Sequence, residues 1–480
     1  MKKANVGVRL RRFREERGLT QAALAQALGI SPSYVNQIES NQRPITAPVL
    51  LKLAAVFEVD FQEFSTDEAD RLTGQLRDAL LDSSIGEKIS HSEIRELAET
   101  MPAIARHVIE LDRRYRHVLA TNESITSRID AANFGANTIP APMAFEEVRD
   151  FFYVRRNYFS TLDEAAERIF ADAALNIGDT ASGIAHRLTQ LHGTRIQELG
   201  SDDTSGIVRR FTPATNVLAV SSVLSSGQRA FQLASHLALV EARDLIEQII
   251  DESRLSSRET ETLVRIGLSN YFAGAVVLPY RQFLEAAETL RYDIDLLAQK
   301  FRVGFETIAH RLSTLQRPGA RGVPFIFVRM DRAGNISKRV SATSFDFSRV
   351  GGSCPLWNVH EAFAYPAQIH SQLAQMPDGR GYLWIARTVS QRSGGYHAPS
   401  KTFAIGLGCD LHHAHRLVYS DGLDLTNPSR LTPIGPGCKV CVRENCPQRA
   451  FPAIGKPLDI DTEQSRFIPY VFGSSADTAP

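Results

Sequence analysis

Two short helix-forming segments joined through one glycine lie near the amino end of the chain, and they constrain its fold more than any other feature. Residues 20–28 (TQAALAQAL) begin with a threonine that can cap a helix, and the apolar side chains that follow share one helical face: Leu24, Ala27 and Leu28. Gly29 closes this helix, and Ser31 or Ser33 caps the next one. The spacing predicts a helix-turn-helix, preceded by a helix over residues 8–17.

The helix expected over residues 31–40 has one apolar face and one polar face. Val35 and Ile38 face inward. The polar face is formed by Tyr34, Asn36, Gln37 and Ser40. Because amide side chains can bond a base edge through paired hydrogen bonds, this face suits the major groove of DNA, and Arg12 and Arg43 suit phosphates. A helical protein-interaction bundle with the same core is the alternative.

Charge is unevenly distributed along the chain, although the formal net charge of its 480 residues is zero. Residues 1–45 carry eight Lys or Arg against three Glu, a formal charge of +5. Residues 46–100 carry five Lys or Arg against twelve Asp or Glu, a formal charge of −7. A basic head within a neutral chain favours a nucleic-acid partner for that segment.

Length and composition indicate a cytoplasmic protein of several domains. At about 150 residues per domain, the length predicts about three domains. The first residues, MKKANVGVRLRRF, lack the apolar stretch of a secretory signal, and no apolar run approaches the ~20 residues that span a bilayer. The five cysteines are an odd number, which argues against a disulfide framework and for a metal site or redox chemistry.

The run RGLTQAALAQALGISPSYVNQIESNQRPIT resembles the XRE, or lambda-repressor-like, family of DNA-binding domains over residues 8–64. The resemblance is carried by Gln21, Leu24-Ala25, Gly29-Ile30-Ser31 and Ile38-Glu39. It implies that the residues at the DNA surface are Gln21, Ser31, Ser33, Tyr34, Asn36 and Gln37. Arg43 is added as a phosphate contact. Because such domains commonly bind two half-sites, a homodimer or a higher homo-oligomer is expected.

Residues 66–135 are polar with a helical pattern and are expected to connect the head to the rest of the chain. Five apolar residues repeat there at the spacing of a coiled coil: Ile104, Val108, Leu111, Tyr115 and Val118. An amphipathic helix packed on its own domain explains the same spacing, and both interpretations stay open. The stretch at 133–144, with two prolines and two asparagines, is the expected linker.

From about residue 145 the pattern changes to amphipathic helices, then a strand pair turning at Thr212–Asn216 and a long helix, SGQRAFQLASHLALVEARDLIEQII. This order resembles the ImmA/IrrE metallopeptidase family, whose long helix carries H-E-x-x-H for zinc and its water. The matching positions are Ser235, His236 and Leu239, and Ile266–Leu268 stand where a third-ligand glutamate is expected. Serine and leucine cannot hold zinc, so we expect a pseudo-peptidase with no catalytic residue, in which His236 is structural.

The last third of the chain combines strand-forming segments with three cysteine-bearing motifs. GVPFIFVRMDRAGNISKRV predicts two strands around an Ala-Gly-Asn turn, and GYLWIARTV and KTFAIGLGC predict two more. The motifs are GGSCPLWNVHEAF (351–363), GLGCDLHHAHRLVYSDGLDL (406–425) and GPGCKVCVRENCPQRAFP (435–452). With the head and the middle, they resemble short-chain fatty acid regulators of the ScfR type over nearly the whole chain.

Three thiolates fall on one short loop, with the spacing Cys438-x2-Cys441-x4-Cys446, so a fourth ligand must come from elsewhere. Cys409, at the end of a predicted strand, is the first choice, and Cys354 is the reserve. By spacing, four thiolates suit zinc and an iron–sulfur cluster about equally. The ScfR resemblance implies the cluster, in the form [4Fe–4S], with zinc as the alternative. A thiolate could be replaced by one of three nearby histidines: His412, His413 and His415. A redox disulfide within the C-x-x-C is disfavoured, because no thioredoxin-like pattern surrounds it.

The sequence therefore predicts a multidomain protein, mainly α and then α+β. The expected domains are an all-α helix-turn-helix domain at 1–66 and a helical connector at 67–144. An IrrE-like domain with a small sheet follows at 145–318, and a cysteine-bearing α+β domain with antiparallel strands at 319–480.

The ScfR resemblance implies a non-enzymatic regulator of propionate or acetate metabolism, such as the methylcitrate or glyoxylate-bypass genes. It would bind a double-stranded DNA operator and an acyl-CoA such as propionyl-CoA or acetyl-CoA. Arg209, Arg210 and Arg229 could meet the phosphates, but exposed arginines on strands are usually only solvated. The alternatives are an IrrE-like zinc protease that cuts a partner regulator, and an antitoxin- or phage-type repressor with a structural zinc site.

Overall fold

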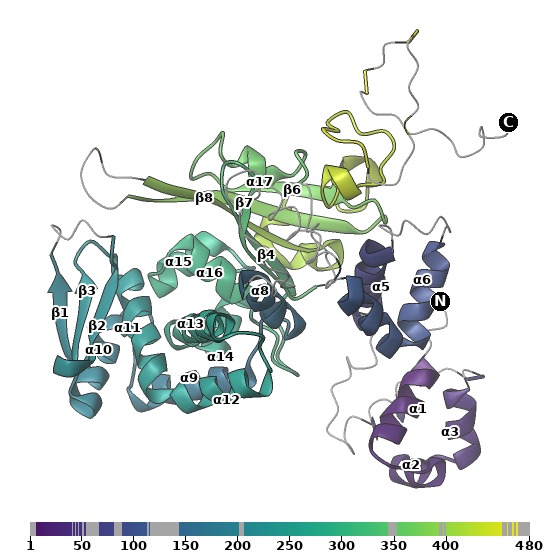
Figure 1. Cartoon of the computed structure of the whole chain (residues 1–480), viewed down its shortest axis with the longest axis horizontal. Coiled ribbons are helices and arrows are strands. Elements are labelled where there is room, and N and C mark those ends of the chain that lie inside the picture. The colour runs from purple at the N-terminus through teal and green to yellow at the C-terminus, as the bar shows by residue number, and fades with distance from the viewer. Residues whose placement is uncertain are drawn as a thin grey trace, which may run out of the picture. The chain divides into compact units, whose positions relative to one another are not determined.

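The computed structural model gives the course of the chain, which Figure 1 shows as a whole. The residues that it describes are 6–40, 42–43, 45–46, 48–49, 52–53, 67–80, 89–112, 115, 144–200, 206–343, 353–392, 397, 400–453, 458, 463–464 and 467–468. The chain divides into two compact units, Met1–Pro140 with Ser344–Asp346, and Ala141–Thr343 with Phe347–Pro480. The finer division into four domains stays a prediction.

The first unit begins with the predicted helix-turn-helix, formed by α1 (Val6–Glu16), α2 (Gln21–Leu28) and α3 (Pro32–Glu39). Its buried core consists of Leu10, Phe13, Leu24, Ala25, Leu28, Val35, Ile38, Val49 and Leu53. The expected place of Ala27 on the apolar face is wrong, because Ala27 is exposed and Ala25 is buried in its stead. Positions 24, 25 and 28 together form the wider apolar stripe typical of helices in globular domains.

Capping residues mark the boundaries of these helices, as the sequence indicates. Oγ1 of Thr20 accepts a hydrogen bond from the Ala23 N–H at 3.1 Å. Ser31, not Ser33, is the second cap, and its Oγ accepts from the Tyr34 N–H at 3.1 Å. Gly29 adopts φ 61°, a left-handed conformation that glycine reaches without strain. The turn between α2 and α3 is therefore encoded by its own residues.

A second helical cluster in this unit is built from α5 (Asp67–Leu80), α6 (His91–Thr100) and the helical residues 102–112. Its buried residues are Leu72, Leu76, Ile94, Ala98, Ala105 and Ile109. Three residues of the coiled-coil pattern are exposed: Ile104, Leu111 and Tyr115. Val108 packs partly against the cluster, while Val118 and nearly all of the expected linker at 133–144 lie outside the described residues. The dimer stays a prediction.

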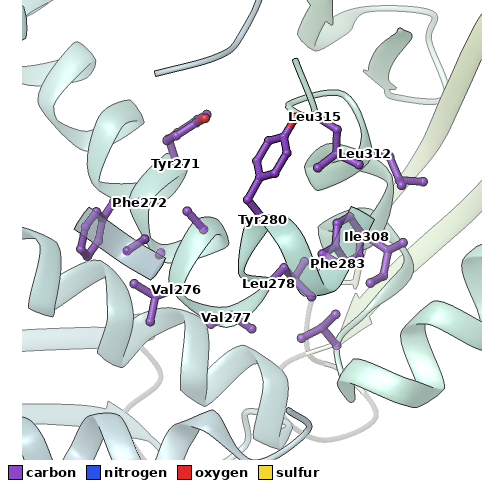
Figure 2. Packing of buried hydrophobic residues seen from close by; sticks show 14 of the residues in the cluster. Tyr271, Phe272, Val276, Val277, Leu278, Tyr280, Phe283, Ile308, Leu312 and Leu315 are labelled. Atoms are coloured by element: carbon purple, nitrogen blue, oxygen red, sulfur yellow. The ribbon is translucent and has the colours of Figure 1, made fainter. Parts of the chain in front are cut away.

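In the second unit the larger sheet lies along one side of a helical core, and the small sheet stands at one end of that core, beside α11 (Ser226–Glu241) (Figure 1). Its first helices are α8 (Ala144–Val154), α9 (Ser160–Asp172), α10 (Thr180–His192), α11 (Ser226–Glu241) and α12 (Arg243–Glu252). They are followed by α13 (Arg258–Val277), α14 (Tyr280–Thr289), α15 (Ile294–Phe301) and α16 (Phe305–Leu312). Figure 2 shows how Phe272, Phe283 and Leu312, from three of these helices, contribute to one packed interior.

A buried ion pair lies inside this helical core. Nη2 of Arg311 and Oδ1 of Asp163 are 2.5 Å apart, and the two side chains are 2% and 0% exposed. The hydroxyl of Tyr271 donates to the other oxygen of Asp163, and Nε of Arg311 donates to the Leu278 carbonyl oxygen at 2.9 Å. Both charges thus have hydrogen-bonding partners, as burial of an ion pair requires. The pair connects α9 to α16.

The small sheet has the strand order β1-β3-β2 and packs beside α11. Its strands are β1 (Arg195–Leu199), β2 (Arg209–Thr212) and β3 (Val217–Ser221). The antiparallel pair β2–β3, turning at Pro213–Asn216, confirms the predicted hairpin. The parallel strand β1 was not predicted, because its five residues, RIQEL, are largely polar and solvent-facing.

The larger sheet has the strand order β5-β4-β8-β7-β6-β9. Its strands are β4 (Phe325–Met330), β5 (Ile336–Ser341), β6 (His370–Gln375), β7 (Gly381–Arg392), β8 (Ser400–Asp410) and β9 (Thr432–Pro433). The predicted β4–β5 hairpin and the strands β7 and β8 are confirmed, and their pairs are antiparallel. The short strand β9 pairs parallel to β6 and brings the cysteine loop to this edge.

The two faces of β8 have different neighbours. Ile405, Leu407 and Cys409 are buried in the core that this sheet shares with the helices. The alternating glycines lie on the opposite face, where a Cβ on Gly406 would be 2.9 Å from Val359 of the short helix α17 (Asn358–Glu361). Strand geometry places successive side chains on opposite faces, so Cys409 and α17 lie on different sides of the sheet.

No single helix among the described residues has both the length and the apolar composition needed to cross a membrane. Helices α13 and α14 reach that composition only as a pair bent by 64°.

Candidate functional site

The first candidate site is the polar surface of α3. Ser33 and Asn36 are exposed on it, and Tyr34 and Gln37 are partly buried. Arg43 follows the helix, with its guanidinium carbon 6.0 Å from the centroid of the Tyr34 ring. This arrangement brings amide, hydroxyl and guanidinium groups to one face of a short helix, as reading of base edges and phosphates requires.

Two of the residues expected at the DNA surface, Gln21 and Ser31, also stabilise the fold of the head. Gln21 donates through Nε2 to Oε2 of the buried Glu39 at 2.7 Å, and Arg14 donates to Oε1 of the same carboxylate, also at 2.7 Å. Glu39 is only 6% exposed, so these bonds compensate for its burial. The Ser31 hydroxyl caps α3. The DNA contacts of all seven residues stay predictions, and the side chain of Arg12 lies outside the described part of the chain.

The second candidate site is the middle of α11, where a peptidase of this fold would hold zinc. Ser235 is buried, and its hydroxyl donates to Oδ1 of Asn270 at 3.4 Å. Leu239 offers no ligand atom. On the facing helix, Ile266 is 52% exposed, Leu268 is fully buried, and a Cβ on Gly267 would be 2.7 Å from the Phe152 ring. The residues at these positions cannot form a zinc site.

His236 is 3% exposed and is the one imidazole at the peptidase-motif positions. Its ring lies 4.4 Å from the Phe211 ring, centroid to centroid. Burial, and then the positive charge of Arg209, lower the pKa of His236 to about 4, so the ring is neutral at physiological pH. Its Nε2 is buried and has no hydrogen-bond partner among the described residues.

The third candidate site is a small cavity at the end of the larger sheet. It is lined by Cys354, Cys438, Cys441, Cys446, Pro355, Pro433, Gly435, Gly437, Arg443 and Arg449. A Cβ on Gly435 would lie only 2.6 Å from Sγ of Cys441, so only glycine lets the backbone approach this sulfur. Four thiols from two distant segments of the chain therefore share one enclosure.

The electrostatics of this cavity follow from its thiols and guanidinium groups. The pKa of Cys354 is raised by burial and, to a smaller extent, by Cys441 and Cys438. Arg443 donates through Nη2 to the Gln375 carbonyl oxygen at 2.9 Å, while its buried Nε has no partner among the described residues. A fixed cation beside several thiols favours thiolates or another anionic group in the cavity. In the described part of the chain, however, no three His, Cys, Asp or Glu side chains already stand at ligand spacing around a single point.

Relatives that match nearly the whole chain establish the family to which it belongs. The chain is 52% identical over 98% of its length to the HTH-type transcriptional regulator RamB of Mycobacterium tuberculosis, covering 99% of that protein. It is also 52% identical to the HTH-type transcriptional regulator PrpR of the same organism, over 97% of this chain and 95% of that one. A propionyl-CoA carboxylase regulator of Cereibacter sphaeroides is 43% identical over 98% of both chains. This chain belongs to the short-chain fatty acyl coenzyme A regulator family.

The parts of this family member match three domain descriptions. Residues 10–64 match a helix-turn-helix, and residues 189–313 match the IrrE N-terminal-like domain. Residues 314–470 match the carboxy-terminal domain of short-chain fatty acyl coenzyme A regulators. A solved Mycobacterium tuberculosis transcriptional regulator is 55% identical, with a TM-score of 0.67, and covers 69% of this chain and 100% of its own. RamB and PrpR are HTH-type transcriptional regulators, and this chain likewise carries a helix-turn-helix head.

Cys409, the first choice for the fourth ligand, does not line this cavity, and the identity of the fourth ligand stays a prediction. Cys409 is fully buried in β8 between Phe325 and Leu383, on the face of the sheet that packs against the helices. The reserve, Cys354, lines the cavity instead, because its segment leads into α17 on the other face. A histidine is not among the lining residues either, since His412, His413 and His415 lie in the 3-10 turn that follows β8.

Sequence reasoning missed two groups of residues around these sites. Arg443 and Arg449 line the cysteine cavity, although no role was predicted for either. Arg209 meets α11 at Gln232 and Phe211 meets it at His236, contacts that a sequence separation of more than twenty residues conceals. The one available signal was the alternation of Arg209 and Phe211 on a predicted strand, which puts both on one face.

Proposed function

We propose that this chain is a sequence-specific DNA-binding transcription regulator of propionate or acetate metabolism that responds to an acyl-CoA. The observation that carries the proposal is the full-length similarity to RamB, PrpR and the propionyl-CoA carboxylase regulator, together with the exposed polar face of α3. The operator-binding form is a homodimer or a higher homo-oligomer, because helix-turn-helix proteins commonly bind two half-sites.

The IrrE-like domain acts in this proposal as a sensing domain without catalysis. A zinc peptidase needs two histidines one turn apart and a glutamate that activates water. Ser235, His236 and Leu239 occupy these positions and supply one imidazole between them. A protease function would therefore need a different catalytic centre.

The cysteine cavity is the proposed site of an iron–sulfur cluster, [4Fe–4S] rather than zinc. Its ligands would be Cys354, Cys438, Cys441 and Cys446, which fit the group because four thiols, a glycine contact at Cys441 and the buried Nε of Arg443 converge on one cavity. When bound, such a cluster supplies a redox- and oxygen-sensitive centre. The chain itself supplies backbone donors and guanidinium charge around the sulfurs, which tune clusters of this type.

Operator binding in the presence of ligands tests the proposal. DNA selected from a random pool by the full-length protein would serve as the operator, and its affinity would be measured against propionyl-CoA, acetyl-CoA and propionate. A tenfold shift with an acyl-CoA corresponds to a coupling free energy of about 1.4 kcal/mol, within the usual allosteric range. Sequence-specific binding that no acyl-CoA alters, or that propionate alters equally, contradicts the effector part of the proposal. Absence of any selected sequence contradicts the DNA-binding part.

A further inference from the structure

Arg209 is a partly buried cation without an acidic partner among the described residues. On β2, its Nη1 donates to the carbonyl oxygen of Gln232 at 3.2 Å. Burial lowers the pKa of Arg209, and no carboxylate opposes that effect. The nearby Arg187, by contrast, pairs with Glu241 at 2.7 Å. A partly desolvated charge that no described carboxylate compensates is unfavourable, so its presence in a folded chain points to a group that completes it.

His236 provides a second incomplete group next to this cation. Its Nε2 is buried without a hydrogen-bond partner in the described part of the chain, and the charge of Arg209 contributes to the low pKa of the ring. Among the described residues, Arg209 thus lacks a carboxylate partner and His236 Nε2 lacks a hydrogen-bond partner. A bound cation is disfavoured there, since the guanidinium would repel it.

The register of strand and helix explains why the two groups meet. Arg209 and Phe211 are two residues apart on β2 and so lie on the same face of the small sheet. Gln232 and His236 are four residues apart on α11 and share one helical face. The two pairs contact each other in order: Arg209 bonds Gln232, and Phe211 packs on His236.

We propose that Arg209 and His236 form a binding subsite for an oxyanion, a carboxylate or phosphate group, at the position where a peptidase of this fold would hold zinc. The planar guanidinium matches two oxygens of such a group, and the neutral imidazole can donate a hydrogen bond through Nε2 to another. The Phe211 ring packs against His236 beside this position, 4.4 Å from it, centroid to centroid. The subsite deepens the proposed function, and only its link to an effector rests on that function.

Binding measurements on the full-length protein test the subsite. The probes are inorganic phosphate, propionate and coenzyme A, titrated calorimetrically into protein in an anion-poor buffer. Arg209→Gln should weaken binding of the successful probe at least tenfold, and His236→Gln should weaken it less, because the amide keeps one donor. Arg195→Gln is the matched control: Arg195 lies on β1 of the same sheet, is exposed, and its Nη2 donates to the Thr215 carbonyl oxygen at 3.4 Å. The affinity of Arg195→Gln for the same probe should equal that of the wild type.

The identity of the probe distinguishes the source of the oxyanion. Phosphate and coenzyme A binding without propionate binding identifies a phosphate subsite, and propionate binding identifies a carboxylate subsite. If no probe binds the wild type, or if Arg209→Gln and Arg195→Gln bind alike, the subsite is refuted. Should Arg209→Gln fail to fold, the imidazole nitrogen resonances of His236 in the wild type decide, since a bound oxyanion must shift the Nε2 signal.

Operator binding by the same variants separates this inference from the proposed function. Loss of oxyanion binding in Arg209→Gln supports the subsite even if wild-type operator affinity never responds to propionyl-CoA, an outcome that refutes only the effector role. Conversely, a wild-type operator response together with unchanged oxyanion affinity in Arg209→Gln refutes the subsite and leaves the proposed function standing.

Discussion

Nη2 of Arg449 donates a hydrogen bond to the carbonyl oxygen of Cys441 at 3.2 Å. Through Nη1 the same guanidinium also reaches the Cys438 carbonyl oxygen, at 3.3 Å, and the side chain is only 3% exposed. A single buried cation thus organises the loop that carries three of the thiols, and charge-assisted bonds of this kind are stronger than neutral ones. The predictions below begin with this loop.

Replacing the cysteines one at a time should identify the four ligands. Cys354→Ser is expected to remove iron and the visible absorption of anaerobically purified protein, because the thiol lines the cavity. Cys409→Ala should retain both, since this cysteine lies on the other face of β8. Iron and sulfide counted per chain provide the measurement. Iron kept in Cys354→Ser and lost in Cys409→Ala would reverse the assignment, and zinc without iron or sulfide would exclude the cluster.

Gly435→Ala should lower the metal content and the stability of the carboxy-terminal part. The new Cβ would lie 2.6 Å from Sγ of Cys441, so the sulfur or the loop must move. The matched control is Gly274→Ala in α13, where a Cβ meets no atom within 4 Å and alanine is favoured in a helix. Thermal unfolding and metal analysis of both variants check the expectation, and equal metal content in the two would contradict it.

Substitutions on α3 should separate base reading from phosphate contact. Gln37→Ala is expected to lower specific binding by ~1–3 kcal/mol and to change sequence preference, if it makes a bidentate base contact. Arg43→Ala should weaken all sequences similarly and flatten the dependence of affinity on salt. The exposed Glu96→Ala on α6 serves as the control. Gel-shift titrations in which Gln37→Ala leaves the specificity ratio unchanged would overturn the proposed orientation of the helix.

Asp163→Asn should destabilise the second unit strongly. It leaves Arg311, which is 2% exposed, without its carboxylate, and breaking a buried pair in this way costs about 3–5 kcal/mol. Glu167→Gln removes the partner of Arg317 from a pair that is 20% and 25% exposed, and a cost of about 1 kcal/mol or less is expected there. Urea unfolding of both variants gives the comparison. Similar costs for the two would show that water reaches the inner pair.

Stability should fall with acid partly through His236. In the folded state the pKa of His236 is about 4, against 6.5 for the free side chain. Between pH 6.5 and pH 4 the imidazole therefore binds a proton in the unfolded chain but stays neutral in the folded chain. The contribution therefore destabilises progressively as pH falls from 6.5 and levels off below 4. His236→Phe, which keeps an aromatic ring beside Phe211, should lose less stability than the wild type over this window. If the free energies of unfolding of the wild type and of His236→Phe change with pH in parallel, the assignment is refuted.

Local features of the head were predictable because they depend on neighbours in the chain. Thr20, Gly29 and Ser31 act within four residues of their own positions, and the structure confirms their roles. The exchange of Ala27 for Ala25 was not predictable with the same certainty, because either fits an apolar stripe of α2 until the packing of the other helices selects one.

The sequence by itself determined which chemistry is present: a helix-turn-helix, a peptidase helix without its ligands, and a loop with three thiols. Only the tertiary structure decided which distant residues join them. Cys354 meets the loop and Cys409 does not, because strand alternation buries Cys409 on the helical face of β8. Arg209 bonds Gln232 and its charge acts on His236, because the register of β2 against α11 brings residues far apart in the chain close together. Local pattern defines the face of an element, whereas the partner of that face depends on how whole elements pack.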